Sequence, residues 1–187
     1  EHAHFFLTLA EAVEPELMGA NQAASLDRLE MEYDNLRAAV DWYRASGDIE
    51  GGLRLAMALH RFWEMRVHLR EGYHQLDKLL HSPAQPTTRR AGALRMAGRL
   101  AFGVGNYMAA RTHFQESLAL ARELGDKQSI AAALNNLGLV AEYGLNDYLE
   151  AHVLYEESLA IRRELGNKRG IAAVLNNLAN VADYEGN

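Results

Sequence analysis

The chain has 187 residues, of which 49% are hydrophobic and 24% charged, so its composition is typical of a folded protein and excludes a disordered one. The net charge of −6 argues against nucleic acid as the partner, because proteins that bind nucleic-acid backbones usually present a basic surface. Cysteine is absent, which excludes disulfides and thiolate chemistry and fits a cytoplasmic location, and no apolar run approaches the ~18 residues of a membrane span.

The first half of the chain has helical periodicity. Apolar residues from Leu26 to Tyr43 recur at intervals of three and four, which is the stripe of an amphipathic helix, and Gly47 ends it. Pro83 and Pro86 exclude a continuous helix through residues 82–88 and make that stretch resemble a linker. The pattern predicts helices over about 1–13, 22–46, 49–65 and 69–80.

The second half repeats itself. Residues 94–130 and 134–171 are near copies, and a third copy opens at Leu175 and stops halfway. Repetition at this period predicts stacked structural units. No stretch alternates with a period of two, so we expect no strands. Helices are predicted over about 88–103, 106–124, 128–144, 147–165 and 168–185.

Small and large residues occupy matching positions in the copies. Gly98 and Gly138 lie in the first helix of their pairs, and Phe114 and Tyr155 lie in the second. A missing side chain on one helix lets an aromatic ring of the other come close, as packed antiparallel helices require. Ser117 and Ser158 are expected to have a structural role at the same crossings.

These positions resemble the tetratricopeptide repeat. Its Leu-Gly pair appears at Leu137-Gly138, its turn at Gly105-Asn106-Tyr107 and its alanine at Ala110 and Ala151. Leucine replaces the usual tryptophan of the first helix, arginine replaces the usual proline after the second, and the period is 40–41 residues instead of 34. HEAT and armadillo repeats have a similar period but do not predict this pattern. The sequence pattern ELGD/ELGN…ALNNLG resembles that of the long repeats of kinesin light chains.

The resemblance implies an all-α, right-handed α-solenoid of antiparallel helix pairs with about nine helices, forming one continuous superhelical domain. Residues 1–82 would supply capping helices and a degenerate repeat in which Gly72 takes the position of Ala110. Residues 83–90 would form a linker turn, and residues 91–187 two full repeats and the first helix of a third. The chain begins without methionine and ends inside a repeat, so we expect it to be a piece of a longer protein.

A second resemblance covers the first half. The runs LEMEYDNLRAAVDW (29–42) and LRLAMALHRFWEMRVHLREGYHQL (53–76) are similar to the segment that follows the ATPase and winged-helix parts of bacterial multidomain signal-transduction ATPases, including LuxR-type regulators. In those proteins a C-terminal helical-repeat region serves as a sensor or interaction arm. This resemblance implies a context in transcriptional regulation, not an activity.

No catalytic or cofactor-binding pattern stands out. There is no phosphate-binding G-x-x-x-x-G-K-[ST] loop, and the repeat explains Gly103-Val104-Gly105 as a turn. The eight histidines show no metal-ligand spacing, and neighbouring carboxylates such as Glu156 and Glu157 point apart on a helix. We therefore expect neither enzymatic activity nor a cofactor nor a metal.

The resemblance places the partner on the concave wall formed by the first helix of each pair. Arg61, Arg95 and Arg99 would form a basic end able to bind a carboxylate, or would only be solvated. Asparagines 135 and 176 would grip a peptide backbone, whereas Asn136 and Asn177 would join repeats. The expected partner-binding residues are Met57, Arg61, Arg95, Arg99, Phe102, Asn135, Leu139, Glu142, Tyr143, Asn176, Asn180 and Tyr184.

Two functions remain open. The first is a non-enzymatic module that binds a peptide or protein segment. The second is a structural or self-assembly element that positions other domains and has no ligand of its own. The last helix (168–185) is expected to lack a partner and to leave Ile171, Val174, Leu178 and Val181 partly uncovered, so self-association through it is a further expectation.

Overall fold

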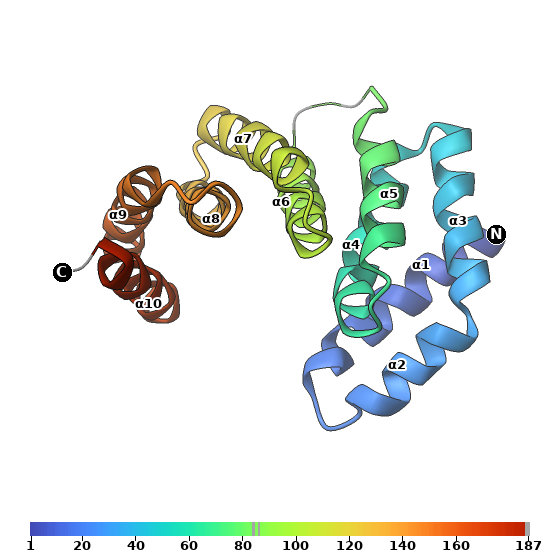
Figure 1. Ribbon diagram of the computed structural model, residues 1–187. Coiled ribbons are helices and arrows are strands. Elements are labelled where there is room, and N and C mark those ends of the chain that lie inside the picture. Colours follow the sequence, from blue (N-terminus) through green and yellow to red (C-terminus); the bar gives the residue numbers. More distant parts are fainter. Residues whose placement is uncertain (84, 86, 186–187) are drawn as a thin grey trace. The chain divides into compact units, whose positions relative to one another are not determined.

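The computed structural model describes residues 1–83, 85 and 87–185, and these residues form ten α-helices and no strand (Figure 1). The all-α prediction is therefore confirmed. The chain divides into two compact units, Glu1–Gln85 and Pro86–Asn187. The division falls within the predicted linker 83–90, although α6 already begins at Thr88.

The first unit contains five α-helices and one 3₁₀ turn. They are α1 (His2–Val13), the 3₁₀ turn Glu14–Met18, α2 (Gln22–Met31), α3 (Tyr33–Ser46), α4 (Ile49–Met65) and α5 (Leu69–Leu80). The helix predicted over 22–46 is in fact two helices. Glu32 separates them with a ψ of 7°, outside the α-helical region, and α2 and α3 run in different directions in Figure 1. This break raises the expected nine helices to ten.

The core of the first unit lies around α4, which packs against α1, α3 and α5. Trp63 of α4 is buried against Gly72 of α5, where an added Cβ would come within 2.5 Å of the indole ring. In the regular copies the large residue is on the second helix and the glycine on the first. In the degenerate repeat the glycine is on the second helix, at the position of Ala110, and the tryptophan is on the first helix, at the position of Ala101.

The second unit contains five α-helices that pack in sequence. They are α6 (Thr88–Gly103), α7 (Tyr107–Glu123), α8 (Lys127–Leu139), α9 (Tyr148–Glu164) and α10 (Lys168–Glu185). Helices α6 and α7 form one pair, α8 and α9 form the next, and α10 packs against α9. The helix pairs predicted from the repeat are therefore present in this unit.

The expected glycine–aromatic contacts hold both pairs together. An added Cβ on Gly98 would meet the ring of Phe114 at 2.5 Å, and one on Gly138 would collide with the ring of Tyr155. The two serines have the structural role predicted for them. Ser117 donates a hydrogen bond to the carbonyl of Ala91, and Ser158 to that of Ala131, both at 2.8 Å.

The turns of the second unit are specified by their own residues. The side chains of Asn106, Asp126 and Asp147 accept backbone N–H groups at the starts of α7, α8 and α9. Gly125 and Gly166, which occupy equivalent positions after the second helix of each pair, adopt φ values of 68° and 64°. Left-handed backbone of this kind is available to glycine without the steric cost of a Cβ.

The first helix of the second pair ends differently from prediction. It was expected to run over 128–144, but α8 stops at Leu139 and a π-helical turn, Val140–Leu145, follows. Thirteen positions separate Leu94 from Tyr107, whereas fourteen separate Leu134 from Tyr148. The wider π turn accommodates this extra residue, as single-turn π insertions do in other helices.

The predicted uncovered stripe on α10 is wrong for Val174 and Val181, whereas Ile171 and Leu178 are half-buried. Val174 and Val181 are fully buried against α9, and Ile171 and Leu178 pack against the same core. The exposed face of α10 instead contains Leu175, which is 46% exposed. Its neighbours on that face are Ala172 and Ala179.

The equivalent positions in α8 show why this face is exposed. Ala131, Leu134 and Gly138 are buried there, and Gly138 lies against Tyr155 of the second helix, α9. In each pair, therefore, the face of the first helix that contains these positions packs against the second helix of the same pair. The opposite face of the first helix packs against the second helix of the preceding pair. The prediction had assigned the uncovered side to the wrong face.

Candidate functional site

Helices α8 and α10, the first helices of consecutive copies, are linked through their polar side chains. The Nδ2 of Asn177 donates to Oδ1 of Asn135 at 3.2 Å. The Nδ2 of Asn180 donates to the hydroxyl of Tyr143, just after α8, at 3.4 Å. The surface formed by Asn135, Tyr143, Asn176, Asn177 and Asn180 is called the amide face below.

The amide face keeps unused hydrogen-bonding capacity. A carboxamide has two N–H donors and a carbonyl oxygen that accepts two bonds, so one contact occupies only part of Asn135 or Asn177. Asn176 is exposed and Tyr143 is 48% exposed. The bond from Asn177 supports the expectation that this residue joins repeats, and it shows that Asn135 takes part in the same joint.

Two other residues expected on this wall are turned inward. Glu142 was predicted to be exposed, and this is wrong: it is 2% exposed, and its Oε2 accepts a hydrogen bond from Tyr155 at 2.7 Å. Burial, followed by the nearby Glu142 carboxylate, raises the pKa of Tyr155. Leu139 packs against the core that contains Tyr155 and Leu159. Neither Glu142 nor Leu139 forms part of the amide face.

Three of the residues predicted to bind a partner lie on helix α6. Arg95 is half-buried, and its Nε is removed from solvent without a hydrogen-bond acceptor. Burial and the charge of Arg99 lower the pKa of Arg95, against a smaller opposing effect of Asp126. Arg99 is exposed, and the ring of Phe102 packs edge-on against Tyr107 with centroids 5.3 Å apart.

The remaining predicted residues do not join this group. Met57 and Arg61 belong to the first unit, where both are half-buried and Nη1 of Arg61 lies 2.8 Å from Sδ of Met18. A basic end that combines Arg61 with Arg95 and Arg99 therefore stays a prediction. The side chain of Tyr184 lies outside the described residues.

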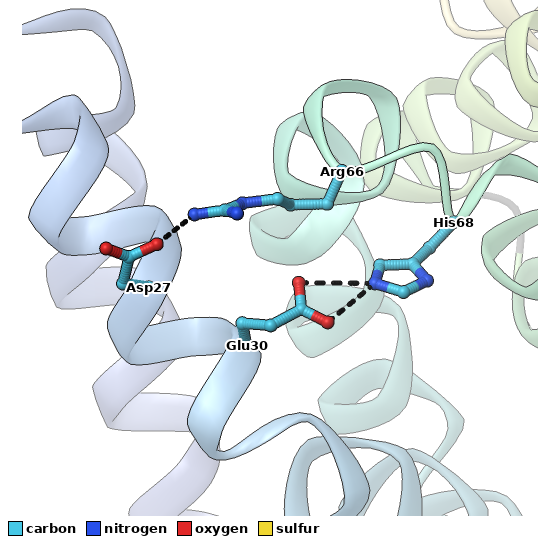
Figure 2. A network of polar contacts seen from close by, with 4 residues as sticks. All are labelled: Asp27, Glu30, Arg66 and His68. Carbon is cyan, nitrogen blue, oxygen red and sulfur yellow. Dashed lines mark hydrogen bonds and ion pairs between the residues drawn. The ribbon is translucent and has the colours of Figure 1, made fainter.

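Sequence reasoning missed a polar network in the first unit. Figure 2 shows Asp27 and Glu30 of α2 paired with Arg66 and His68, which lie in the turn between α4 and α5. His68 reaches Glu30 at 3.0 Å and stacks on Tyr33. Between the two paired residues lies Val67, 78% exposed and with a φ of 63°. The only sign of this unusual turn in the sequence was that Val67 occupies the position of Gly105 in the next copy.

Two concavities were also not predicted. One of about 540 Å³ lies beside the turn between α4 and α5 and is lined by Val67, His68, Arg70, Glu71, Tyr73 and His74. Another of about 350 Å³ lies among α7, α8 and α9. Within the part of the chain that is described, no group of three or more His, Asp or Glu side chains is arranged to hold a metal ion. No helix among the same residues is long and apolar enough to cross a membrane.

Paired helices, glycine–aromatic contacts and linked first helices define a helical-repeat protein. Residues 89–164 match the tetratricopeptide-repeat family, so this part of the chain consists of tetratricopeptide repeats. It is also 33% identical over 151 residues to proteins named as HTH-type transcriptional regulators in Mycobacterium bovis and Mycobacterium tuberculosis. That match covers 76% of this chain but only 17% of each relative.

Solved structures share the fold. Tetratricopeptide-like repeats named for a kinesin light chain of Podospora anserina superpose with a TM-score of 0.74 at 15% identity, covering 100% of this chain and 89% of that one. A signal-transduction ATPase with numerous domains and a tetratricopeptide-repeat sensor, from Pyrococcus horikoshii, gives 0.72 at 17% identity, covering 94% of this chain and 26% of that one. At these identities the likeness concerns the fold alone.

Proposed function

We propose that this chain is a non-enzymatic module that binds a peptide or protein segment and acts as the sensor or interaction arm of a bacterial signal-transduction or transcriptional regulator. The observation that carries the proposal is the amide face, where Asn135, Asn177 and Asn180 stand beside the partly exposed Tyr143. An extended peptide offers backbone N–H and C=O groups along its length, and carboxamides can pair with both.

The internal bonds of the amide face support binding without rearrangement. Because Asn177 holds Asn135 and Asn180 holds Tyr143, these side chains are already restricted before a ligand arrives. A ligand then loses less free energy to ordering of the protein. The regulator context rests on the mycobacterial relatives, whose names describe transcriptional regulators.

A peptide selection on the whole chain tests the proposal. Short random peptides are selected on the immobilised chain, and the affinity of enriched sequences is then measured by fluorescence polarisation. Asn176→Ala removes an exposed amide and should weaken binding by about tenfold, or roughly 1.4 kcal/mol, without changing stability. Thr112→Ala, an exposed residue of α7, is the matched control and should bind like the original chain. Equal affinity of both variants would contradict the proposal.

The alternative is a scaffold that assembles with itself or positions other domains. The exposed face of α10, with Leu175 flanked by Ala172 and Ala179, favours it because an apolar strip can be covered by a second copy. Sedimentation velocity over a range of concentrations distinguishes the two functions. Under the scaffold function the chain dimerises and Leu175→Glu abolishes the dimer, whereas peptide binding alone leaves a monomer.

A further inference from the structure

The turn between α4 and α5 contains a strained residue that the fold does not account for. Val67 has a φ of 63°, and its side chain is 78% exposed. The next copy has Gly105 at this position, with a φ of 79° and no Cβ to oppose it. A β-branched residue is unfavourable in left-handed backbone, and an exposed one gains little from burial. The contacts within the folded chain therefore give no reason for a valine here.

The two neighbours of Val67 hold the turn in this conformation. Arg66 pairs with Asp27 of α2, and Nε2 of His68 lies 3.0 Å from a carboxylate oxygen of Glu30 (Figure 2). Strained residues persist where their surroundings hold them in place, and they occur preferentially at active sites and ligand-binding sites. The valine side chain is thus presented to solvent in a fixed position.

Val67 lines the concavity of about 540 Å³ beside this turn. Binding sites for small molecules usually have volumes of roughly 300–1,000 Å³, so the size is suitable. Each of the other lining residues is exposed or half-buried, so a ligand can reach its side chain. These residues, from the turn and the first two turns of α5, are His68, Arg70, Glu71, Tyr73 and His74.

The concavity offers charges of both signs. Arg70 and His74 are exposed, lie one turn apart on α5 and form no ion pair or hydrogen bond with another residue that the structure describes. Glu71 lines the same concavity, and its Oε1 accepts a hydrogen bond from Gln75 at 3.1 Å. Because a carboxylate can accept several hydrogen bonds, Glu71 is still able to bind a donor. An anionic group of a ligand is therefore attracted to Arg70, and a cationic group to Glu71.

We propose that this concavity binds a small zwitterion of the amino-acid type with an apolar side chain. The ligand carboxylate accepts hydrogen bonds from the guanidinium of Arg70, its ammonium group donates to Glu71, and its side chain lies against Val67. A simple anion would be repelled by Glu71 and a simple cation by Arg70, whereas a zwitterion is attracted to both. This proposal concerns the first unit alone and does not rest on the peptide-binding function of the amide face.

Free amino acids test the site. The ¹⁵N-labelled chain is titrated with L-leucine and separately with L-phenylalanine, while the backbone resonances of Val67 and Arg70 are followed by NMR. We expect both resonances to shift and saturate. The resonance of Arg28, exposed on α2 and outside the concavity, serves as the reference and should move little. If neither amino acid produces a saturable shift at Val67 or Arg70, the proposal is overturned.

Analogues that lack one charge test the recognition of both. Isocaproate and hydrocinnamate are leucine and phenylalanine without the amino group, whereas isoamylamine and phenethylamine lack the carboxylate. Each analogue should bind at least about tenfold more weakly than its parent amino acid, because one charged contact is lost. An acid that binds as tightly as its parent would show that Glu71 does not bind the ammonium group. An amine that does so would exclude the role of Arg70, and either result overturns the proposal.

Val67→Gly separates binding from folding. Glycine relieves the backbone strain, so this variant should melt no lower than the original chain. It should nevertheless bind the amino acid about tenfold more weakly, because the apolar contact is lost. Arg70→Gln should also lose affinity, whereas Arg28→Gln, which replaces an exposed arginine outside the concavity, should bind like the original chain. If Val67→Gly or Arg70→Gln binds as tightly as the original chain, the proposal is overturned.

One further variant separates this proposal from the proposed function. Asn176 belongs to the second unit and does not line the concavity. Asn176→Ala should therefore weaken the binding of selected peptides and leave the affinity for the amino acid unchanged. A loss of amino-acid affinity in Asn176→Ala would place the ligand at the amide face and overturn the site beside Val67.

Discussion

The hydroxyl of Tyr155 donates a hydrogen bond to Glu142 at 2.7 Å inside the second unit, and both side chains are buried. In the preceding copy the equivalent positions hold Phe114 and Phe102, which need no such bond. Glu142 lies in the π-helical turn that accommodates the extra residue of its copy. Of the two complete copies, only the second therefore contains both the inserted residue and the hydrogen bond between Tyr155 and Glu142.

Tyr155→Phe should lower the free energy of unfolding by about 1–3 kcal/mol, because the buried carboxylate of Glu142 loses its donor. Its other oxygen, Oε1, already lacks a partner among the described residues. The double variant Tyr155→Phe with Glu142→Leu should be closer to the original chain than the single variant, since both polar partners are then removed. Urea unfolding measures each value. A single variant as stable as the original chain would contradict the role given to the bond.

Val67 and Gly105 provide a reciprocal experiment on the turn between two paired helices. Both adopt left-handed backbone, with φ values of 63° and 79°, which is unfavourable for a β-branched residue by about 1–2 kcal/mol. Val67→Gly should therefore raise stability and Gly105→Val should lower it, each by roughly 1 kcal/mol after the greater chain entropy of glycine is included. Thermal unfolding of both variants tests the pair. Destabilisation by Val67→Gly would show that the side chain contributes more than the strain costs.

The sequence was sufficient for the parts of the fold that repeat. The helix pairs, the contacts of Gly98 and Gly138, and the roles of Ser117 and Ser158 were predicted because each appears twice at one spacing. The π turn was not predicted. The period of 41 residues showed that one residue is inserted, but it did not show where the backbone widens.

The candidate site was predicted less well than the fold. Periodicity identifies the faces of a helix but does not tell which face meets which neighbour. For this reason Glu142 was expected outside and lies inside, and the uncovered stripe of α10 was assigned to Val174 and not to Leu175. The asparagines were singled out because a carboxamide can both donate to and accept from a peptide backbone. The hydrogen bond from Asn177 to Asn135 joins two adjacent first helices, so it could not be predicted from the sequence of a single copy. The lack of an acceptor for Nε of Arg95 likewise depends on the neighbouring helices.

Gly98→Ala tests the contact between α6 and α7. The added Cβ would lie 2.5 Å from the ring of Phe114, so one helix must shift or the ring must leave its position. We expect a loss of about 1–3 kcal/mol, typical of overpacking. Phe114→Leu in the same chain should recover part of that loss by making room for the methyl group. If the double variant is as unstable as the sum of the two singles, the two sites act independently and the contact does not explain the glycine.

The cap of α8 should make stability depend on acidic pH. Hydrogen bonds from the Ser129 side chain and then from its backbone lower the pKa of Asp126 below its ordinary value of 3.8. The folded state therefore favours the carboxylate. Its contribution is fully present above pH 3.8 and is lost as the pH falls through the lower value of the folded state.

Asp126→Asn retains an oxygen that can cap α8 but removes the charge. At neutral pH it should be less stable than the original chain by about 1 kcal/mol, and the difference should shrink as the pH falls below 3.8. Ser129→Ala removes the main cause of the shift, so the pH dependence assigned to Asp126 should become weaker in that variant. Urea unfolding at a series of pH values measures both effects. If the difference in stability between Asp126→Asn and the original chain stays constant across the pH series, the hydrogen bonds of Ser129 do not favour the charged form of Asp126. The reason is linkage: a group whose pKa differs between the folded and unfolded states makes stability depend on pH.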